Sequence, residues 1–186
     1  MNHNAGYNSA MAFRIRQGSS TDGPTLMHIE HSCRTAATFL PPALRDPGAI
    51  RPRQWRQWIL CHPPFDRHPT RRTVLVAYEH SDVLGFVAAM HDSLFGGYRA
   101  DIAGLFVLPK YRRLGIGSAL LIRAARWLHE DGITRVTADC YAHDPTRSFF
   151  ERMGGVVIAR TGEEDDPAAV ATFGFANFRE LAARQI

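Results

Sequence analysis

A loop with two glycines, set between a strand-like run and a long apolar helix, constrains the fold of this chain more than any other feature. It lies in the run "KYRRLGIGSALLIRAARWLHEDG", which spans residues 110 to 132. Gly115 and Gly117 let backbone N–H groups approach a ligand, and a helix start carries partial positive charge. Three cationic side chains precede the glycines: Lys110, Arg112 and Arg113. Together these features indicate a binding site for phosphate groups.

Two familiar phosphate motifs match this loop poorly. A nucleoside triphosphate loop requires a lysine directly after its last glycine, whereas Ser118 follows Gly117. A dinucleotide fingerprint requires a third glycine where Leu120 stands, in a loop that directly follows its strand. Asp139 on the next strand keeps a dinucleotide site open as an alternative. A plain exposed turn ahead of a core helix, with solvated arginines, is a second alternative.

The periodicity of apolar residues predicts a chain of strands and helices around this loop. The segments expected to form strands are residues 13–17, 73–79, 83–91, 98–109, 133–141, 155–160 and 169–178. The segments expected to form helices are a run capped by Thr21 or Asp22, residues 51–61, residues 117–132, and residues 145–154 behind an Asp144 cap. The two strands around the turn at residues 80–82 are expected to form a β-hairpin.

Composition limits the class of protein but leaves the ligand open. Residues 1–12 are expected to form a flexible tail before a single domain over residues 13–186. The net charge of +4 is too modest to indicate nucleic acid, and no apolar run reaches the roughly 20 residues of a membrane-spanning helix. Three cysteines in unrelated contexts, Cys33, Cys61 and Cys140, favour thiols in a reducing compartment. We therefore expect a cytoplasmic protein.

The run from Asp101 to Val156 resembles motifs A and B of the GNAT superfamily of N-acetyltransferases. The family signature is Gln or Arg, two residues, Gly, one residue, then Gly or Ala, and here it reads "RRLGIG" over residues 112–117. The segment "LFVLPKY" precedes it, and "FFERMGG" follows after a further helix and strand. The resemblance implies an α/β (α+β) fold. In this fold a mixed, largely antiparallel central sheet of about six to seven strands is flanked by about four helices.

The resemblance also implies that the glycine loop cradles the pyrophosphate of acetyl-CoA. Backbone N–H groups from residues 114–118 would face the phosphates. One strand residue, Phe106 or Val107, would offer its N–H to the oxyanion, and both would pair with the pantetheine arm. The full set of expected cofactor contacts is Phe106, Val107, Arg112, Arg113, Leu114, Gly115, Ile116, Gly117, Ser118, His143 and Phe150.

Acetyl transfer to an amine requires a proton acceptor, since a lysine-like amine has a pKa of about 10.4. Asp101 stands where several family members carry a catalytic glutamate, and we predict that it acts as general base through water. An exposed carboxylate without a role is the alternative. In the family this aromatic position often holds a tyrosine that serves as the general acid. Here the residue is Phe150, which has no proton to donate. Tyr141, His143 or Ser148 could act as general acid instead, or the thiolate could leave unaided.

Other reactive side chains carry weaker predictions. Cys140 with His143 could form a nucleophilic pair, but a cysteine that alternates with apolar residues is more typical of a core. Cys61, His62 and His68 lack a second ligand pair at zinc spacing, so we predict no metal.

The sequence thus predicts an acetyl-CoA-dependent N-acetyltransferase. Its acceptor would be a primary amine of a small molecule or a peptide, attacking directly in a ternary complex. The alternative from another class is a non-catalytic acyl-CoA-binding or sensing domain, which Phe150 makes more credible. Neither a nucleic acid nor a membrane is expected as partner, and a homodimer is left open.

Overall fold

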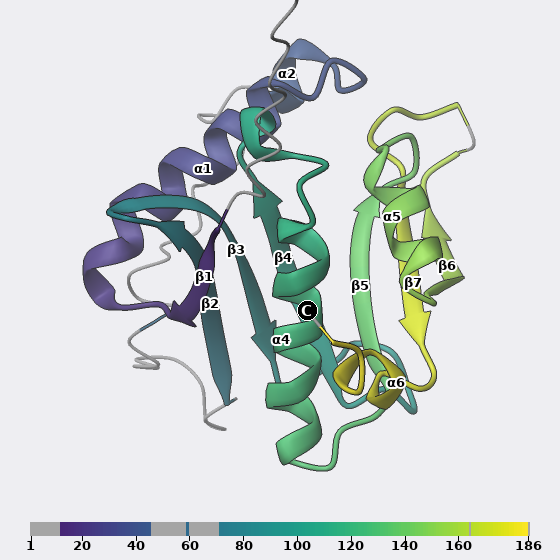
Figure 1. The fold of residues 1–186 in the computed structure, drawn as a ribbon. Coiled ribbons are helices and arrows are strands. Elements are labelled where there is room, and N and C mark those ends of the chain that lie inside the picture. Colours follow the sequence, from purple (N-terminus) through teal and green to yellow (C-terminus); the bar gives the residue numbers. More distant parts are fainter. Residues whose placement is uncertain (1–11, 46–58, 60–70, 164, 186) are drawn as a thin grey trace, which may run out of the picture.

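One sheet of seven strands organises the part of the chain that the computed structural model describes, residues 12–45, 59, 71–163 and 165–185. The strand order is β1-β2-β3-β4-β5-β7-β6 (Figure 1). The strands are β1 (Arg14–Gln17), β2 (Arg72–Glu79), β3 (Asp82–Met90), β4 (Ala100–Val107), β5 (Val136–Tyr141), β6 (Val156–Thr161) and β7 (Val170–Phe175). Among the described strands, β4 and β5 form the only parallel pair. The predicted mixed, largely antiparallel fold is therefore confirmed.

Helices cover both faces of this sheet. They are α1 (Gly23–Thr35), α2 (Pro42–Arg45), α4 (Ile116–Glu130), α5 (Thr146–Arg152) and α6 (Arg179–Ala182), with short 3₁₀ turns η1 (Ser20–Asp22) and η2 (Pro109–Tyr111). Alternate residues of a strand face opposite sides of its sheet. Leu75 accordingly packs in the large cluster under α4, whereas Val74 and Val76 pack under α1. The sheet thus separates two apolar cores.

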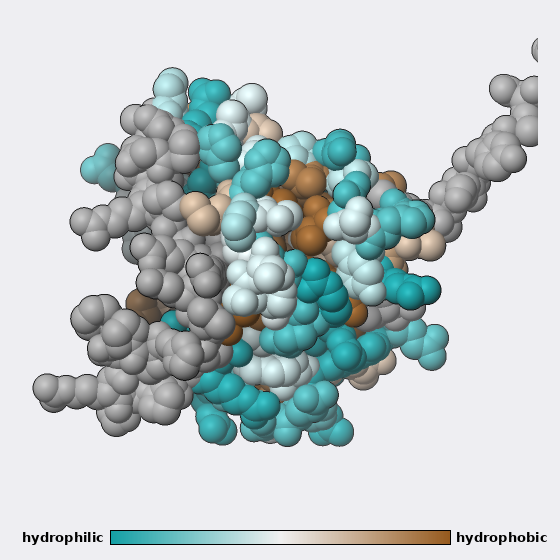
Figure 2. Space-filling model, turned by 90° about the vertical axis from the view of Figure 1, so that its left-hand side faces the viewer, coloured by the Kyte–Doolittle hydropathy of each residue, from teal (hydrophilic) through white to brown (hydrophobic). Residues whose placement is uncertain are grey.

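The two longest helices differ in how much of their surface is buried. Helix α1 buries Leu26, Ile29 and Cys33 at helical spacing and exposes its other side. The described surface on the side of α1 and β1 is mostly hydrophilic (Figure 2). Helix α4 buries eight of its residues, as its apolar sequence predicts. None of the described helices is long and apolar enough to cross a membrane.

The order of the strands and of the longer described helices agrees with the sequence predictions, whereas the short helices α2 and α6 were not predicted. The hairpin of β2 and β3, the strand before the glycine loop and the helix after it are confirmed. Asp22 is the N-cap residue of α1, and Asp144 Oδ1 accepts a hydrogen bond from the Thr146 N–H at the start of α5. The helix expected over residues 51–61 lies outside the described residues except for Ile59, and so does the tail except for Ala12.

The parallel strands β4 and β5 stay together over only three residue pairs. Ala100, Asp101 and Ile102 pair with β5, and no further register pairs follow (Figure 1). On the other side of β4 the register with β3 shifts by one residue, so that Ala103 is bulged. A bulge bends its strand and increases local twist. Beyond this bulge β4 separates from β5, and the sheet opens toward the carboxyl end of β4.

Candidate functional site

A cavity of about 550 Å³ lies where β4 and β5 part. One wall is the end of β4, Leu105 to Val107, and a second wall is the glycine loop. The end of α1 with the turn after it, residues 33–40, forms a third, and the start of α5 with Tyr141 forms a fourth. The cavity therefore brings together four segments that are far apart in the sequence.

The backbone of the glycine loop adopts two left-handed conformations in close succession. Arg113 has φ of +66° and Gly115 has φ of +82°. A left-handed conformation costs a residue with a Cβ roughly 1–2 kcal/mol, which explains the glycine at position 115 and marks Arg113 as strained. Gly117 differs, because its φ is ordinary. A Cβ built there would meet Phe149 at 3.7 Å and Val107 at 3.9 Å, which are normal contact distances. Folding alone therefore does not require glycine at position 117.

The start of α4 offers positive charge to the cavity. Its N-cap residue is Gly115, and no side chain in the described part of the chain caps it. The first N–H groups of a helix lack intrahelical partners and carry partial positive charge. Arg112 and Arg113 lie beside them at the cavity wall, and neither forms an ion pair with another described residue. This charge is suited to a phosphate.

The end of β4 presents backbone groups to the gap left by β5. The Leu108 N–H donates to Leu84 O at 3.0 Å, and hydrogen-bonded pairs alternate along an antiparallel ladder. Phe106 therefore directs its backbone groups toward β3, and Val107 directs its own toward the gap. Val107 O accepts hydrogen bonds from Arg112 Nε at 3.1 Å and from Cys33 Sγ at 3.2 Å. Of the two predicted pantetheine partners, Val107 is the one whose backbone faces the cavity.

The predicted residues of the glycine loop divide between cavity and core. Arg112, Arg113, Gly115, Gly117 and Ser118 line the cavity. The Leu114 side chain is exposed outside the lining, and the Ile116 side chain is buried in the core beneath α4. The backbone N–H groups of these two residues remain the groups predicted to face the phosphates.

The aromatic pair of α5 is oriented differently from the sequence prediction. Phe149 lines the cavity. Phe150 is 2% exposed and packs against Phe173 and Phe175 at 5.4 and 6.1 Å between ring centroids, so its side chain does not contribute to the cavity wall. Its neighbour Phe149 takes the place expected for it, because adjacent residues of a helix point about 100° apart and Phe150 is the one that faces the core. Neither ring can donate a proton.

Of the three candidate acids, the structure brings only one to the cavity. Tyr141 lines it, with its ring 6.3 Å from that of Phe39 across the opening. His143 and Ser148 are exposed and lie outside the lining. Proximity to the cavity therefore favours Tyr141.

Asp101 lies outside the cavity, at the end of β4 where the strands are still paired. It lies four positions before Leu105 in the sequence, which is about 13 Å along a strand. Ala100 and Ile102 face the core beneath α4, so Asp101 faces the opposite side of the sheet. Thr137 Oγ1 donates a hydrogen bond to its Oδ1 at 2.8 Å. A proton transfer between Asp101 and a group in the cavity would need intervening water.

Two described thiols can be assessed as nucleophiles. Burial raises the pKa of Cys140 to about 12, so its thiolate is scarce at neutral pH. Cys140 packs against the core beneath α4. These observations favour the structural interpretation of Cys140. Burial also raises the pKa of Cys33 at the cavity wall. Within the described residues no group of three or more His, Cys, Asp or Glu side chains could hold a metal ion.

Sequence reasoning missed several residues of the cavity wall. It did not identify Tyr111, Phe149 or residues 33–40. No sequence signal distinguishes Phe149 from its identical neighbour Phe150 on the short predicted helix. The segment 33–40 carries no motif, and only its place at the end of α1 brings it to the cavity.

Comparison with solved structures shows the same fold. PaiA N-acetyltransferase from Thermoplasma acidophilum, solved in complex with coenzyme A, is 18% identical with a TM-score of 0.69, over 89% of this chain and 99% of that chain. An N-acetyltransferase from Staphylococcus aureus Mu50 is 17% identical with a TM-score of 0.67, over 90% and 99%. The ribosomal-protein-S18-alanine N-acetyltransferase from Escherichia coli is 16% identical with a TM-score of 0.61, over 88% and 93%.

Comparison of the sequence itself identifies the family. No curated protein sequence matches the chain. The family model described as "Acetyltransferase (GNAT) family" matches residues 27–155, which is well over half of the chain. This match includes the glycine loop, the strand before it and the aromatic pair of α5. The resemblance seen in the sequence is therefore confirmed, and the chain belongs to the GNAT family of acetyltransferases.

Proposed function

We propose that this protein transfers an acetyl group from acetyl-CoA to a primary amine of a small molecule or a peptide. The observation that carries the proposal is the start of α4. There a helix N-terminus and two arginines that have, among the described residues, neither a side-chain cap nor an ion-pair partner border the same cavity as a glycine that folding does not require. These features suit the pyrophosphate of coenzyme A, and family membership supports this choice.

The binding roles follow from the walls of the cavity. The N–H groups at the start of α4 and the side chains of Arg112 and Arg113 would bind the phosphates. Val107, whose backbone faces the gap, would align the pantetheine arm as a strand partner. When bound, acetyl-CoA supplies an acetyl group activated as a thioester.

The protein's own groups would manage the charges that develop in the reaction. The Val107 N–H would stabilise the oxyanion of the tetrahedral intermediate. Asp101 would accept the proton of the amine through water, since it lies outside the cavity. Tyr141, the candidate acid at the cavity wall, would protonate the leaving thiolate. The amine would approach from the face opposite α4, toward which Asp101 is directed.

The aromatic pair of α5 supports a second candidate function, an acyl-CoA-binding domain without catalysis. Phe149 at the cavity wall and Phe150 in the core both lack a proton donor. Release of free CoA thiol, measured over a panel of small and peptide amines, separates the two functions. Amine-dependent release supports transfer, whereas acetyl-CoA binding without release by any amine supports the sensor.

A further inference from the structure

A short series of hydrogen bonds ends at Asp101, at the closed end of the β4 and β5 pair. The Phe95 N–H donates to Ser93 Oγ at 3.2 Å. Ser93 Oγ lies 3.0 Å from Thr137 Oγ1, and Thr137 Oγ1 lies 2.8 Å from Asp101 Oδ1. The series therefore connects the loop between β3 and β4 with the carboxylate that we propose as general base.

The number of protons available shows which hydroxyl donates and which group accepts in each of these hydrogen bonds. The Thr137 hydroxyl has one proton and three neighbours: Asp101 Oδ1 at 2.8 Å, Ser93 Oγ at 3.0 Å and Ala100 O at 3.3 Å. An ionised carboxylate accepts only, and it is a stronger acceptor than a neutral carbonyl or hydroxyl. Thr137 therefore donates to Asp101, and Ser93 donates to Thr137. Donors in series polarise one another, so each strengthens the next.

Thr137 is held rigidly enough to orient its neighbour. It is 2% exposed and is the register partner of Asp101 in the short parallel ladder. A β-branched side chain has restricted rotation about χ1, and burial restricts it further. Because Oδ1 is held at one point, the plane of the carboxylate and the direction of Oδ2 are limited.

We infer that Thr137, supported by Ser93, is a positioning residue for Asp101 in acetyl transfer. The inference rests on the proposed function. Neither hydroxyl lines the cavity, so both act through Asp101 rather than on the cofactor. The alternative is a core threonine that merely satisfies its own hydroxyl, and this would affect folding but not the efficiency of the base.

The test compares Thr137→Val, which keeps the shape and removes the hydroxyl, with Thr137→Ser, which keeps the hydroxyl. Thr73→Val is the matched control, because Thr73 is also buried in the sheet, at 3% exposure, and its hydroxyl bonds Gln17 on the face of the sheet opposite to Asp101. Turnover is measured by thiol release with the best amine of the panel, and acetyl-CoA affinity is measured by titration. Each variant is also combined with Asp101→Asn.

The inference predicts a specific pattern. Thr137→Val lowers turnover roughly 10-fold, about the effect of one hydrogen bond to a charged group, and leaves acetyl-CoA affinity unchanged. Thr137→Ser and Thr73→Val keep near wild-type turnover. In the Asp101→Asn background Thr137→Val has no further effect, because the group it positions is already gone. If Thr137→Val does not fold, Ser93→Ala serves in its place, with a smaller loss of turnover that also vanishes in the Asp101→Asn background.

Two results overturn the inference, and they differ from failure of the proposed function. Wild-type turnover in folded Thr137→Val, or an equal loss with and without Asp101, overturns the inference alone. Absence of thiol release by the wild-type protein with every amine overturns the proposed function, and the inference falls with it.

Discussion

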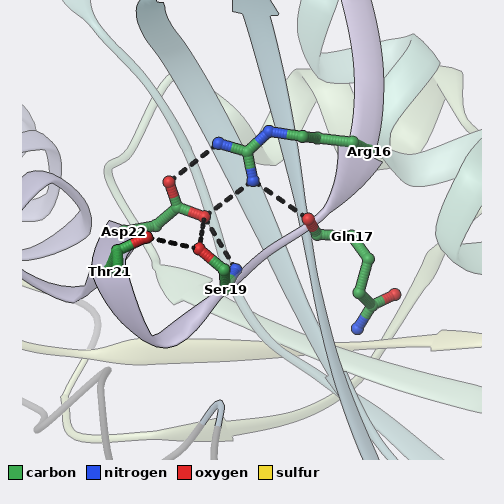
Figure 3. Close-up of polar contacts among 5 residues, drawn as sticks. All are labelled: Arg16, Gln17, Ser19, Thr21 and Asp22. Carbon is green, nitrogen blue, oxygen red and sulfur yellow. Dashed lines mark hydrogen bonds and ion pairs between the residues drawn. The ribbon is translucent and has the colours of Figure 1, made fainter.

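Two helix starts in this protein carry the same partial charge but satisfy it in opposite ways. At the start of the 3₁₀ turn η1, which leads into α1, the Asp22 carboxylate accepts hydrogen bonds from Arg16 at 2.7 and 2.8 Å and from the Ser19 N–H at 2.7 Å (Figure 3). At the start of α4 no carboxylate takes this place within the described residues, and Gly115 is the N-cap residue. The chain's own side chains therefore satisfy the N–H groups at the start of η1, whereas the N–H groups at the start of α4 are open to the cavity.

The electrostatics of the two starts differ accordingly. The hydrogen bonds from Arg16 lower the pKa of Asp22 to about 2, so this carboxylate stays ionised and neutralises its arginine. Arg112 and Arg113 have no such carboxylate among the described residues. The comparison teaches that a helix N-terminus becomes an anion site only where the chain's own side chains leave it unsatisfied. We therefore propose that the start of α4 binds the cofactor, whereas the hydrogen bonds at the start of η1 contribute to stability.

The largest expected effect separates cofactor binding from chemistry. Asp101→Asn keeps the size and hydrogen bonding of the side chain but removes its basicity. Turnover should fall about 10²- to 10⁴-fold, the usual contribution of a general base, and recover in part at high pH as more of the amine is unprotonated. Acetyl-CoA affinity should stay unchanged, because the cofactor is proposed to bind at the start of α4, away from Asp101. The turnover of Asp101→Asn and its acetyl-CoA affinity, obtained by titration, are measured between pH 6 and 10. Turnover equal to that of the wild type at every pH would show that Asp101 is not part of the mechanism.

The next effect concerns the cavity directly. Gly117→Glu places a negative charge where the phosphates are proposed to bind and should weaken acetyl-CoA binding by about 100-fold or more. Gly117→Ala is the matched control, because a methyl group there makes only ordinary contacts with Phe149 and Val107. It should fold normally and lose much less affinity. If Gly117→Glu folds and its affinity for acetyl-CoA is unchanged, the glycine loop is a turn that does not bind the cofactor.

The smallest effect concerns the start of α1. Asp22→Asn removes the ion pair with Arg16 and should lower the free energy of unfolding at pH 7 by about 2 kcal/mol at most, because the Arg16 side chain is 40% exposed and water weakens the pair. Acetyl-CoA affinity should not change. Chemical denaturation measures the stability, with the exposed Asp92→Asn as control. A weaker affinity of Asp22→Asn for acetyl-CoA would contradict the claim that the helix start at Asp22 contributes to stability and not to cofactor binding.

The same variant has a defined pH dependence. The folded pKa of Asp22, about 2, lies below its ordinary value of 3.8. The stabilisation is therefore fully present above about pH 4 and is lost as the pH falls toward 2. Wild type and Asp22→Asn should become equally stable over that interval. A stability difference that stays constant down to pH 2 would show that the ion pair is not its source.

The sequence was sufficient for features that depend on local periodicity. The hairpin of β2 and β3, the buried helix α4 and the cap at Asp144 follow from residues close together in the chain. The insertion of β7 between β5 and β6, and the parting of β4 and β5, depend on pairing between distant segments, which no local pattern encodes.

The candidate site could be predicted in part for the same reason. The glycine loop is one continuous segment, and five of its seven predicted residues line the cavity. The orientation of Phe149 and Phe150 could not be read from two identical neighbours, since it depends on which of them Phe173 and Phe175 cover. The hydroxyls that reach Asp101 come from two other segments. Only the folded chain brings Ser93 and Thr137 to it.

The central claim is that the open start of α4 binds the pyrophosphate of acetyl-CoA. A ligand that binds only the folded state raises the free energy of unfolding, by about 2.7 kcal/mol at 100 times its dissociation constant. Thermal unfolding should therefore shift upward with acetyl-CoA and with CoA. It should shift much less with NAD or ATP, because the loop lacks both the third glycine and the lysine that those nucleotides require. A shift with NAD or ATP but not with acetyl-CoA would contradict the claim.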